Sequence, residues 1–197
     1  INIQKNIPHG SGLGGGSSNA ASLLNFLNKK MNLKLNQDKI TSIATKVGFD
    51  VPISLDNKTT ILAEGNNKIL RINKKLKLNI LIVFPNILCS TKKIYKKNKQ
   101  FNPLPIKFHS HFKNKKRLIN FLKKENNDLE ESVIKLYPKI KKIIDFIQAQ
   151  KGCYFSRITG SGSACFGIFS DTKSIISAQK LIKSKFPKYW LVVSKTM

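Results

Sequence analysis

Hydrophobic and polar positions recur with two different periods along the chain, and the period changes from segment to segment. In residues 20–31, apolar side chains return every three or four positions, which is typical of an amphipathic helix. Residues 36–47 repeat this pattern and are followed by glycine, so a second helix is expected there. A weak alternation at 2–7 predicts a strand, and the segments 59–63 and 68–72 predict two more, paired around a turn-rich connection.

Beyond residue 77 the pattern predicts the order β, helices, β, β, α, β. The expected strands are 78–84, 154–158, 164–169 and 189–193, and the expected helices are 115–123, 127–147 with a break near Pro138, and 174–185. This order is that of the split βαβ, or ferredoxin-like, arrangement. The sequence therefore predicts an α+β protein with one domain over 1–74 and a second over 75–197.

Composition explains much of the strong positive charge without a function. The net charge is +26, 33 of the 36 basic residues are lysine, and lysine, asparagine and isoleucine fill 77 of the 197 positions. A/T-rich codons encode all three residue types. The densest stretch, 91–124, holds 12 basic residues and no acidic one. We interpret it as solvated lysines on a loop, with a nucleic-acid surface as the alternative because aromatic residues are interleaved; they include Tyr95, Phe101, Phe108 and Phe112.

Several classes of protein are disfavoured by what the sequence contains. No run of 18 apolar residues occurs, so a membrane-spanning helix is not expected. The cysteines Cys89, Cys153 and Cys165 are widely spaced and form neither a zinc motif nor a disulfide framework, which favours a reducing compartment. His109 and His111 are interpreted as part of a solvated basic loop rather than as metal ligands.

A glycine-rich loop runs directly into the first predicted helix. Its glycines are Gly10, Gly12, Gly14, Gly15 and Gly16. A bare backbone at a helix N-terminus binds anions, because the first amide groups are unpaired and the helix dipole presents its positive end. Ser17, Ser18 or Asn19 is expected to cap the helix. No lysine follows the glycines, which excludes a Walker A loop, and the nearest acidic residue, Asp38, lies at a helix start, which disfavours a Rossmann loop.

Residues 8–21 resemble the phosphate loop of the GHMP kinases, the family of galactokinase, homoserine kinase and mevalonate kinase. The triple glycine followed by Ser-Ser-Asn-Ala-Ala is the form found in the branch that acts on 4-diphosphocytidyl-2-C-methyl-D-erythritol. Further matches follow in the family's order at 48–52 (Gly-Phe-Asp-Val-Pro), 63–65, 127–130 (Asn-Asp-Leu-Glu) and 157–166. Because these motifs span most of the chain, the resemblance is more specific than a single loop.

The resemblance implies a fold, a reaction and a set of site residues. The implied fold is the GHMP kinase architecture, with an incomplete ribosomal-S5-like N-terminal domain that binds ATP and a ferredoxin-like C-terminal domain. The implied reaction transfers the ATP γ-phosphoryl group to the 2-hydroxyl of 4-diphosphocytidyl-2-C-methyl-D-erythritol, in non-mevalonate isoprenoid (terpenoid) biosynthesis, with Mg²⁺ bridging the phosphates. Ser18 is a candidate Mg²⁺ ligand.

The implied catalytic residue is Asp50, although from the residues alone an aspartate before an X-Pro turn is more often a turn former. The implied ATP-binding residues are Pro8, His9, Gly10, Ser11, Gly12, Leu13, Gly14, Gly15, Gly16, Ser17 and Ser18. The implied phosphate or substrate loop is Thr159, Gly160, Ser161 and Gly162. Alone, this second loop is equally consistent with a plain hairpin turn.

The resemblance also implies an upstream segment with an early lysine that partners the aspartate. We therefore expect the 197-residue chain to show little kinase turnover and an upstream-extended version to show more. Two other functions stay open: another GHMP kinase of homoserine or mevalonate type, and a basic nucleic-acid-binding protein. A bacterial cytoplasm is the expected location, with a plastid as the alternative.

Overall fold

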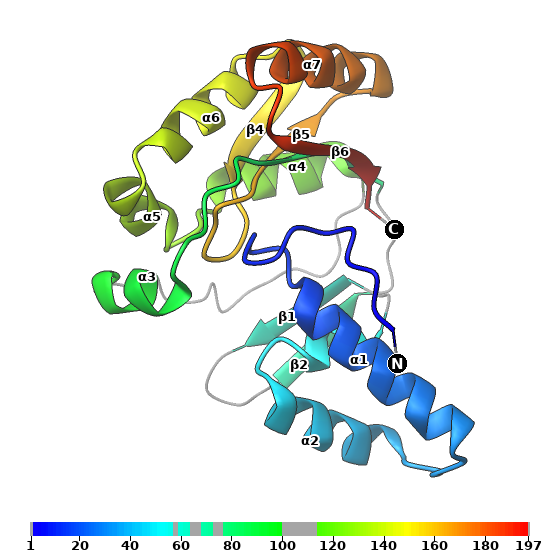
Figure 1. The fold of residues 1–197 in the computed structure, drawn as a ribbon. Coiled ribbons are helices and arrows are strands. Elements are labelled where there is room, and N and C mark those ends of the chain that lie inside the picture. Colours follow the sequence, from blue (N-terminus) through cyan, green and yellow to red (C-terminus); the bar gives the residue numbers. More distant parts are fainter. Residues whose placement is uncertain (1, 57–58, 64–67, 73–76, 100–113, 197) are drawn as a thin grey trace. The chain divides into compact units, whose positions relative to one another are not determined.

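The structure, a computed structural model, contains two compact units that are described separately (Figure 1). The described residues are 2–56, 59–63, 68–72, 77–99 and 114–196. The larger unit consists of Ile1–Leu13 with Lys75–Thr196, and the smaller unit of Gly14–Lys74. From the sequence, residues 1–13 are expected in the same domain as residues 14–74. In the structure they group with the second half of the chain, because residues 11 and 12 are hydrogen-bonded to residues 159 and 164.

The larger unit is built on a four-stranded antiparallel sheet. Its strands are β3 (Asn79–Phe84), β4 (Cys153–Ile158), β5 (Cys165–Phe169) and β6 (Trp190–Lys195). Their spatial order is β4-β5-β3-β6. The first strand along the chain thus lies between the third and the fourth, with the second at the edge. This is the order of a ferredoxin-like sheet and confirms the α+β prediction.

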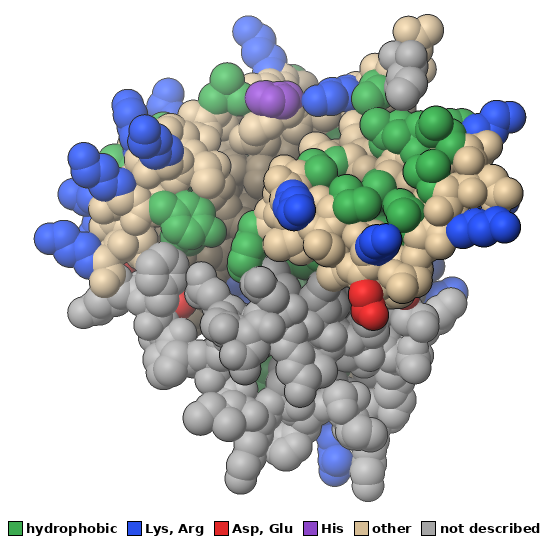
Figure 2. All heavy atoms as spheres, turned by 90° about the horizontal axis from the view of Figure 1, so that it is seen from below, with side chains coloured by type: hydrophobic (Ala, Val, Ile, Leu, Met, Phe, Trp, Pro, Cys, Tyr) green, Lys and Arg blue, Asp and Glu red, His purple; other side chains and the backbone are tan. Residues whose placement is uncertain are grey.

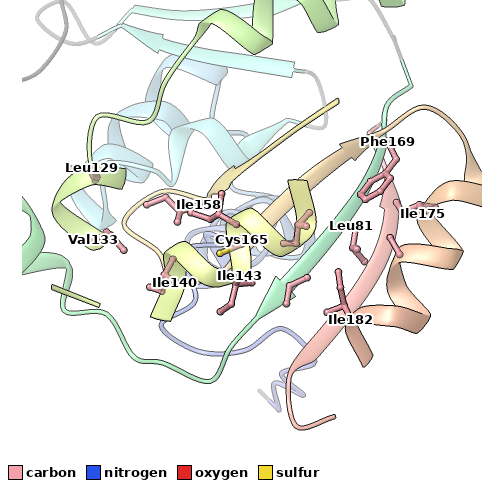
Figure 3. Close-up of a cluster of buried hydrophobic side chains, with 14 of the residues drawn as sticks. Leu81, Leu129, Val133, Ile140, Ile143, Ile158, Cys165, Phe169, Ile175 and Ile182 are labelled. Atoms are coloured by element: carbon pink, nitrogen blue, oxygen red, sulfur yellow. The ribbon is translucent and has the colours of Figure 1, made fainter. Parts of the chain in front are cut away.

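Alternation along the strands gives the sheet two apolar faces. One face packs against α6 (Lys139–Gln148) and α7 (Thr172–Lys185), which lie together on the same side of the sheet (Figure 1). Cys165 and Phe169 of β5 point into this main core, which Figure 3 shows. The other face carries Ile168, which packs with Ile119 of α4 (Lys115–Lys124).

Two short helices of this unit pack against each other, and only one of them was expected. Helix α5 (Glu130–Leu136) ends just before Pro138, which separates it from α6 as predicted. Helix α3 (Thr91–Lys97) was not predicted. Its single buried residue is Ile94, so the surrounding lysines leave no repeating apolar stripe to detect.

The smaller unit contains α1 (Gly15–Lys30), α2 (Gln37–Val47), the 3₁₀ helix η1 (Pro52–Leu55) and the antiparallel strands β1 (Thr59–Ala63) and β2 (Lys68–Ile72). Its core joins Ala21 of α1, Ala44 of α2 and Val51, all almost completely buried. The connection predicted at 64–67 lies outside the described residues.

The strand predicted at residues 2–7 is wrong. These residues are exposed and are not part of a strand. Their alternation is weak, and among the described strands none pairs with them. In the parts of the chain that the structure describes, no helix has both the length and the apolar character needed to cross a bilayer.

Candidate functional site

The first half of the glycine-rich loop is held against the 159–164 bend within the larger unit. The backbone N–H of Ala164 donates a hydrogen bond of 2.9 Å to the carbonyl of Ser11. The Thr159 hydroxyl donates to the carbonyl of Gly12. Within the bend, the N–H of Gly162 donates to the carbonyl of Thr159 at 2.8 Å. These contacts explain why residues 1–13 group with the second half of the chain, and they bring the two predicted loops together.

Gly12 is the point of closest approach between the two loops. Its φ is +77°, and a Cβ built on it would lie 2.4 Å from the Thr159 carbonyl oxygen and 2.8 Å from that of Gly162. Both neighbours are backbone atoms, so neither can move away as a flexible side chain would. Across the contact, Gly160 has φ +49°, and its added Cβ would lie 3.2 Å from the Gly12 carbonyl oxygen. The sequence requires glycine here because the two backbones touch.

The second half of the loop forms the start of α1 in the smaller unit. Gly14 precedes the helix in the left-handed conformation, with φ 66°, and its carbonyl accepts the N–H of Ser18 at 2.9 Å. No side chain caps the helix, so the predicted capping by Ser17, Ser18 or Asn19 is wrong. The turn at Gly14 starts the helix at Gly15, which places both serines inside its first turn rather than before it.

This uncapped helix start has the properties of an anion site. Its first amide groups have no intrahelical acceptor, and they stand at the positive end of a 16-residue helix. Apart from chain neighbours and the backbone of α1 itself, no heavy atom of the described residues lies within 4 Å of a Cβ built on Gly14 or Gly16. Gly16 lies in the helix itself, where alanine would be the better helix former. Packing against neighbouring atoms therefore does not explain why positions 14 and 16 are glycine.

Asp50 lies on the turn between α2 and η1. Val51, only 3% exposed, anchors this turn in the small core, and its N–H donates to the carbonyl of Gly48 at 3.1 Å. The Asp50 side chain is exposed. The Ser54 hydroxyl donates to the Asp50 backbone carbonyl at 3.4 Å, and Asp50 lies within a turn, as the residues alone indicate. Within this unit, η1 packs against α1, which carries residues 15–18.

The remaining predicted residues of the glycine-rich loop differ in exposure. Pro8 is partly buried, and its backbone carbonyl accepts the Ser11 hydroxyl at 2.7 Å. His9 is exposed, and Leu13 is partly buried. Gly10 has φ +66° and faces Leu88 of the same unit.

One neighbour of the bend was missed from the sequence. Thr91, the first residue of α3, pairs its hydroxyl with that of Ser161 at 2.9 Å. It lies in the lysine-rich stretch, where nothing in the spacing singled it out. His109, His111, Phe101, Phe108 and Phe112 lie outside the described residues.

The cysteines offer no activated nucleophile. Burial raises the pKa of the Cys89 and Cys153 thiols to about 11, and raises that of Cys165 further. These thiols therefore stay protonated at neutral pH and pack as small apolar groups. Among the described residues, no three histidine, cysteine or acidic side chains gather as a metal site.

The basic side chains on the face shown in Figure 2 are dispersed rather than gathered into one patch. Acidic side chains are sparse on the same face (Figure 2). This distribution agrees with the compositional explanation of the charge. The nucleic-acid alternative depends on residues 91–124, of which residues 100–113 are not described.

Comparison with protein families places the chain in a known class. Residues 1–58 match the GHMP kinase N-terminal domain, and residues 110–188 match the GHMP kinase C-terminal domain. The first match contains the glycine-rich loop at 8–18, and the second contains the 159–164 bend. The chain belongs to the GHMP kinases, which are ATP-dependent kinases of small molecules.

The curated relatives narrow this class to one member. A 4-diphosphocytidyl-2-C-methyl-D-erythritol kinase from Pelagibacter ubique is 36% identical over 100% of this chain and 69% of the relative. The kinase of the same name from Wolbachia pipientis wMel is 34% identical over 97% of this chain and 66% of the relative. The chain thus spans about two thirds of the length of these relatives.

Solved structures agree with the assignment. A crystal structure of 4-(cytidine 5'-diphospho)-2C-methyl-D-erythritol kinase superimposes with a TM-score of 0.74 at 25% identity, over 96% of this chain and 68% of that one. Homoserine kinase from Cytophaga hutchinsonii gives a TM-score of 0.71 at 13% identity, over 98% of this chain and 68% of that one. At that identity the second match shows the fold alone.

Proposed function

We propose that the chain acts in a kinase reaction that transfers the γ-phosphoryl group of ATP to the 2-hydroxyl of 4-diphosphocytidyl-2-C-methyl-D-erythritol. The observation that carries the proposal is the uncapped start of α1 behind a bare glycine backbone. Such a helix start stabilises phosphate through its amide groups and dipole. The names of the curated relatives supply the substrate, and homoserine or mevalonate are the competing acceptors.

The loop residues take complementary parts in this proposal. Residues 14–18 offer amide groups and serine hydroxyls to the ATP phosphates, and residues 8–13 are the part of the loop that precedes this helix start. The 159–164 bend holds that preceding part through the bond from Thr159 to Gly12. The bend's own Ser161 hydroxyl is partly buried and pairs with that of Thr91, so Thr91 and Ser161 are proposed to face the substrate side as a pair.

Asp50 is the proposed general base. Its exposed carboxylate stands on a turn fixed by buried Val51, so it is presented to solvent from a rigid position. As the substrate oxygen bonds to the γ-phosphorus, the bond from that phosphorus to the β–γ bridging oxygen breaks. ADP leaves with that electron pair, and the hydroxyl proton passes to the Asp50 carboxylate.

The donor set at the helix start fits Mg²⁺ as a phosphate-bound ion. Mg²⁺ takes most of its ligands from phosphate and water and needs only one or two oxygen ligands from the protein. The Ser18 hydroxyl, exposed in the first turn of α1, is the proposed protein ligand. When bound, the ion neutralises charge on the transferring phosphoryl group. We further propose a bacterial cytoplasm as the location, in keeping with the bacterial relatives.

A phosphoryl-transfer assay tests the reaction. Radiolabelled γ-phosphate is followed from ATP to 4-diphosphocytidyl-2-C-methyl-D-erythritol, homoserine or mevalonate, each offered alone and in competition. Even at low turnover, the label that is transferred is expected on the first acceptor, and label on homoserine or mevalonate instead would overturn the substrate assignment.

Asp50→Asn supplies the matched test of the base, because it keeps the turn and removes the proton acceptor. General bases typically contribute about 10²–10⁴-fold in rate. We expect a loss in kcat of that size with little change in ATP affinity. An equal kcat for the variant would contradict the proposed role.

A further inference from the structure

The side chain of Asn127 does more than begin a helix. Its Oδ1 accepts the N–H of Leu129 at 3.0 Å, which is the local helix-start role that the sequence indicates. Its Nδ2 group, however, donates to the carbonyl of Gly160 at 2.8 Å and to that of Ile158 at 3.4 Å. The Asn127 side chain thus links the start of α5 to Ile158 and Gly160, the two ends of the segment 158–160 that leads into the 159–164 bend.

Glu130 holds the same segment from the next position on α5. Its Oε2 accepts the backbone N–H of Ile158 at 2.8 Å. Ile158 is 1% exposed, so this N–H has no access to bulk water and depends on the carboxylate for its hydrogen bond. Together, the two side chains bond three backbone groups of the segment 158–160: the N–H and carbonyl of Ile158 and the carbonyl of Gly160.

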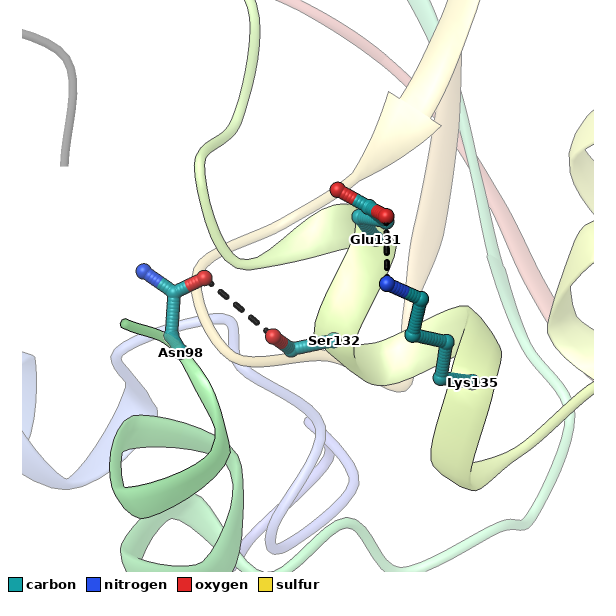
Figure 4. A network of polar contacts seen from close by, with 4 residues as sticks. All are labelled: Asn98, Glu131, Ser132 and Lys135. Atoms are coloured by element: carbon teal, nitrogen blue, oxygen red, sulfur yellow. Dashed lines mark hydrogen bonds and ion pairs between the residues drawn. The ribbon is translucent and has the colours of Figure 1, made fainter. Parts of the chain in front are cut away.

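Helix α5 is itself firmly placed. Leu129 and Val133 are buried in the main core, which Figure 3 shows. Val133 also lies under the bend, 3.3 Å from a Cβ built on Gly162. Elsewhere on this helix, the hydroxyl of buried Ser132 donates to Asn98 at 3.2 Å, and exposed Lys135 pairs with Glu131 (Figure 4). The partners in these two contacts are not residues of the bend.

An unbroken series of contacts therefore runs from α5 to the glycine-rich loop. Asn127 and Glu130 fix the segment 158–160. The next contacts in the series are the Thr159 hydroxyl on the Gly12 carbonyl and the Ala164 N–H on the Ser11 carbonyl. Because these two hydrogen bonds tie residues 11 and 12 to the bend, a shift of the bend is expected to displace these residues as well.

We infer that Asn127 and Glu130 are positioning residues for nucleotide binding: they act through the 158–160 segment to hold residues 11–12 of the phosphate loop. The inference rests on the proposed function, since it assigns them to ATP affinity. It gives a physical role to the Asn-Asp-Leu-Glu segment, 127–130, through the bonds of its first and last residues to the 158–160 segment.

Asn127→Asp separates this role from the helix start. The aspartate keeps an oxygen for the Leu129 N–H but replaces the amide donor with a carboxylate facing two carbonyls. The dissociation constant for ATP, measured by calorimetry on the whole chain, is expected to rise about tenfold. Thr159→Val should raise it similarly. The double variant should lose less than the product of the two single losses, because both changes act through one bend.

Glu130 provides a second, milder pair of variants. Glu130→Ala removes the acceptor of the Ile158 N–H and should weaken ATP binding about tenfold, whereas Glu130→Gln keeps an oxygen there and should stay within about twofold of the parent. Ser132→Ala is the matched control on the same helix: it removes the bond to Asn98, lowers the melting temperature and leaves ATP affinity within about twofold. If Asn127→Asp fails to fold, the Glu130 pair decides the question.

Hydrogen exchange separates failure of this inference from failure of the proposed function. The Ala164 amide, bonded to Ser11, should exchange faster in Asn127→Asp and Glu130→Ala than in the parent or Ser132→Ala, whether or not ATP is present. If the parent binds no ATP, the proposed function fails, while faster Ala164 exchange would still support the positioning role. Unchanged Ala164 exchange in both variants, or equal ATP affinity in Glu130→Ala and Glu130→Gln, would overturn the inference.

Discussion

Replacing Gly12 by alanine tests the contact between the two loops. Two effects add in this variant. A φ of +77° costs an L-residue about 1–2 kcal/mol. The new Cβ would also lie 2.4 Å from the Thr159 carbonyl oxygen, where even forced packing of an extra methyl costs about 1–3 kcal/mol. We therefore expect docking of the loop on the bend to weaken by about 2–5 kcal/mol.

Gly14→Ala is the matched control for this change. Gly14 has a similar φ, +66°, but no heavy atom of the described residues within 4 Å of its added Cβ. It therefore carries only the backbone cost, about 1–2 kcal/mol. The difference between the two variants isolates the steric contact with the bend.

Exchange of the Ala164 amide is the local assay, because its acceptor is the carbonyl of Ser11 next to Gly12. Exchange in Gly12→Ala should be accelerated well beyond that in Gly14→Ala, by about tenfold or more if the contact costs at least 1.4 kcal/mol. Equal exchange in the two variants would refute the close approach of Gly12 to the bend.

Two further predictions concern the stability of the larger unit. Gly167→Ala would place its Cβ 2.5 Å from Cγ2 of buried Ile147, and should lower the free energy of unfolding in urea by about 1–3 kcal/mol; an unchanged midpoint would contradict the packing of α6 on β5. Asp171 caps α7 by accepting the Ser174 N–H at 2.7 Å, and hydrogen bonds from Ser170 and Ser174 lower its pKa to about 2. Because the folded pKa lies below the unfolded value of ~3.9, the stabilisation is present above that pH and is lost as pH falls through 2. The melting temperature of Asp171→Ala should thus lie below the parent's at pH 7 and converge with it near pH 2, whereas a constant gap would count against the cap.

Elements with a clear apolar period could be predicted closely. The stripe in 36–47 corresponds to α2 at Gln37–Val47, and the run at 164–169 to β5 at Cys165–Phe169. Such patterns predict structure because burial of one face is what stabilises the element. Helix α3 escaped detection because burial of Ile94 alone leaves no period.

The site could be predicted only where neighbours in sequence are also neighbours in space. The glycine-rich loop and its helix are contiguous, so the bare start of α1, which we propose binds phosphate, could be recognised, although the absence of a side-chain cap could not. From the sequence, Asn127 was interpreted as a helix start. This role involves only Leu129, two positions further along the chain. Its second role depends on Gly160, 33 positions further along the chain, a contact that only the fold creates.

ATP binding by the chain and by Ser17→Asp tests the central claim most directly. The variant places a carboxylate in the first turn of α1, where the γ-phosphate is proposed to bind, and acidic residues are compatible with a helix N-terminus, so the fold is expected to survive. Calorimetric titration should show the parent binding ATP and the variant binding none. Binding of equal strength by both proteins would contradict the account.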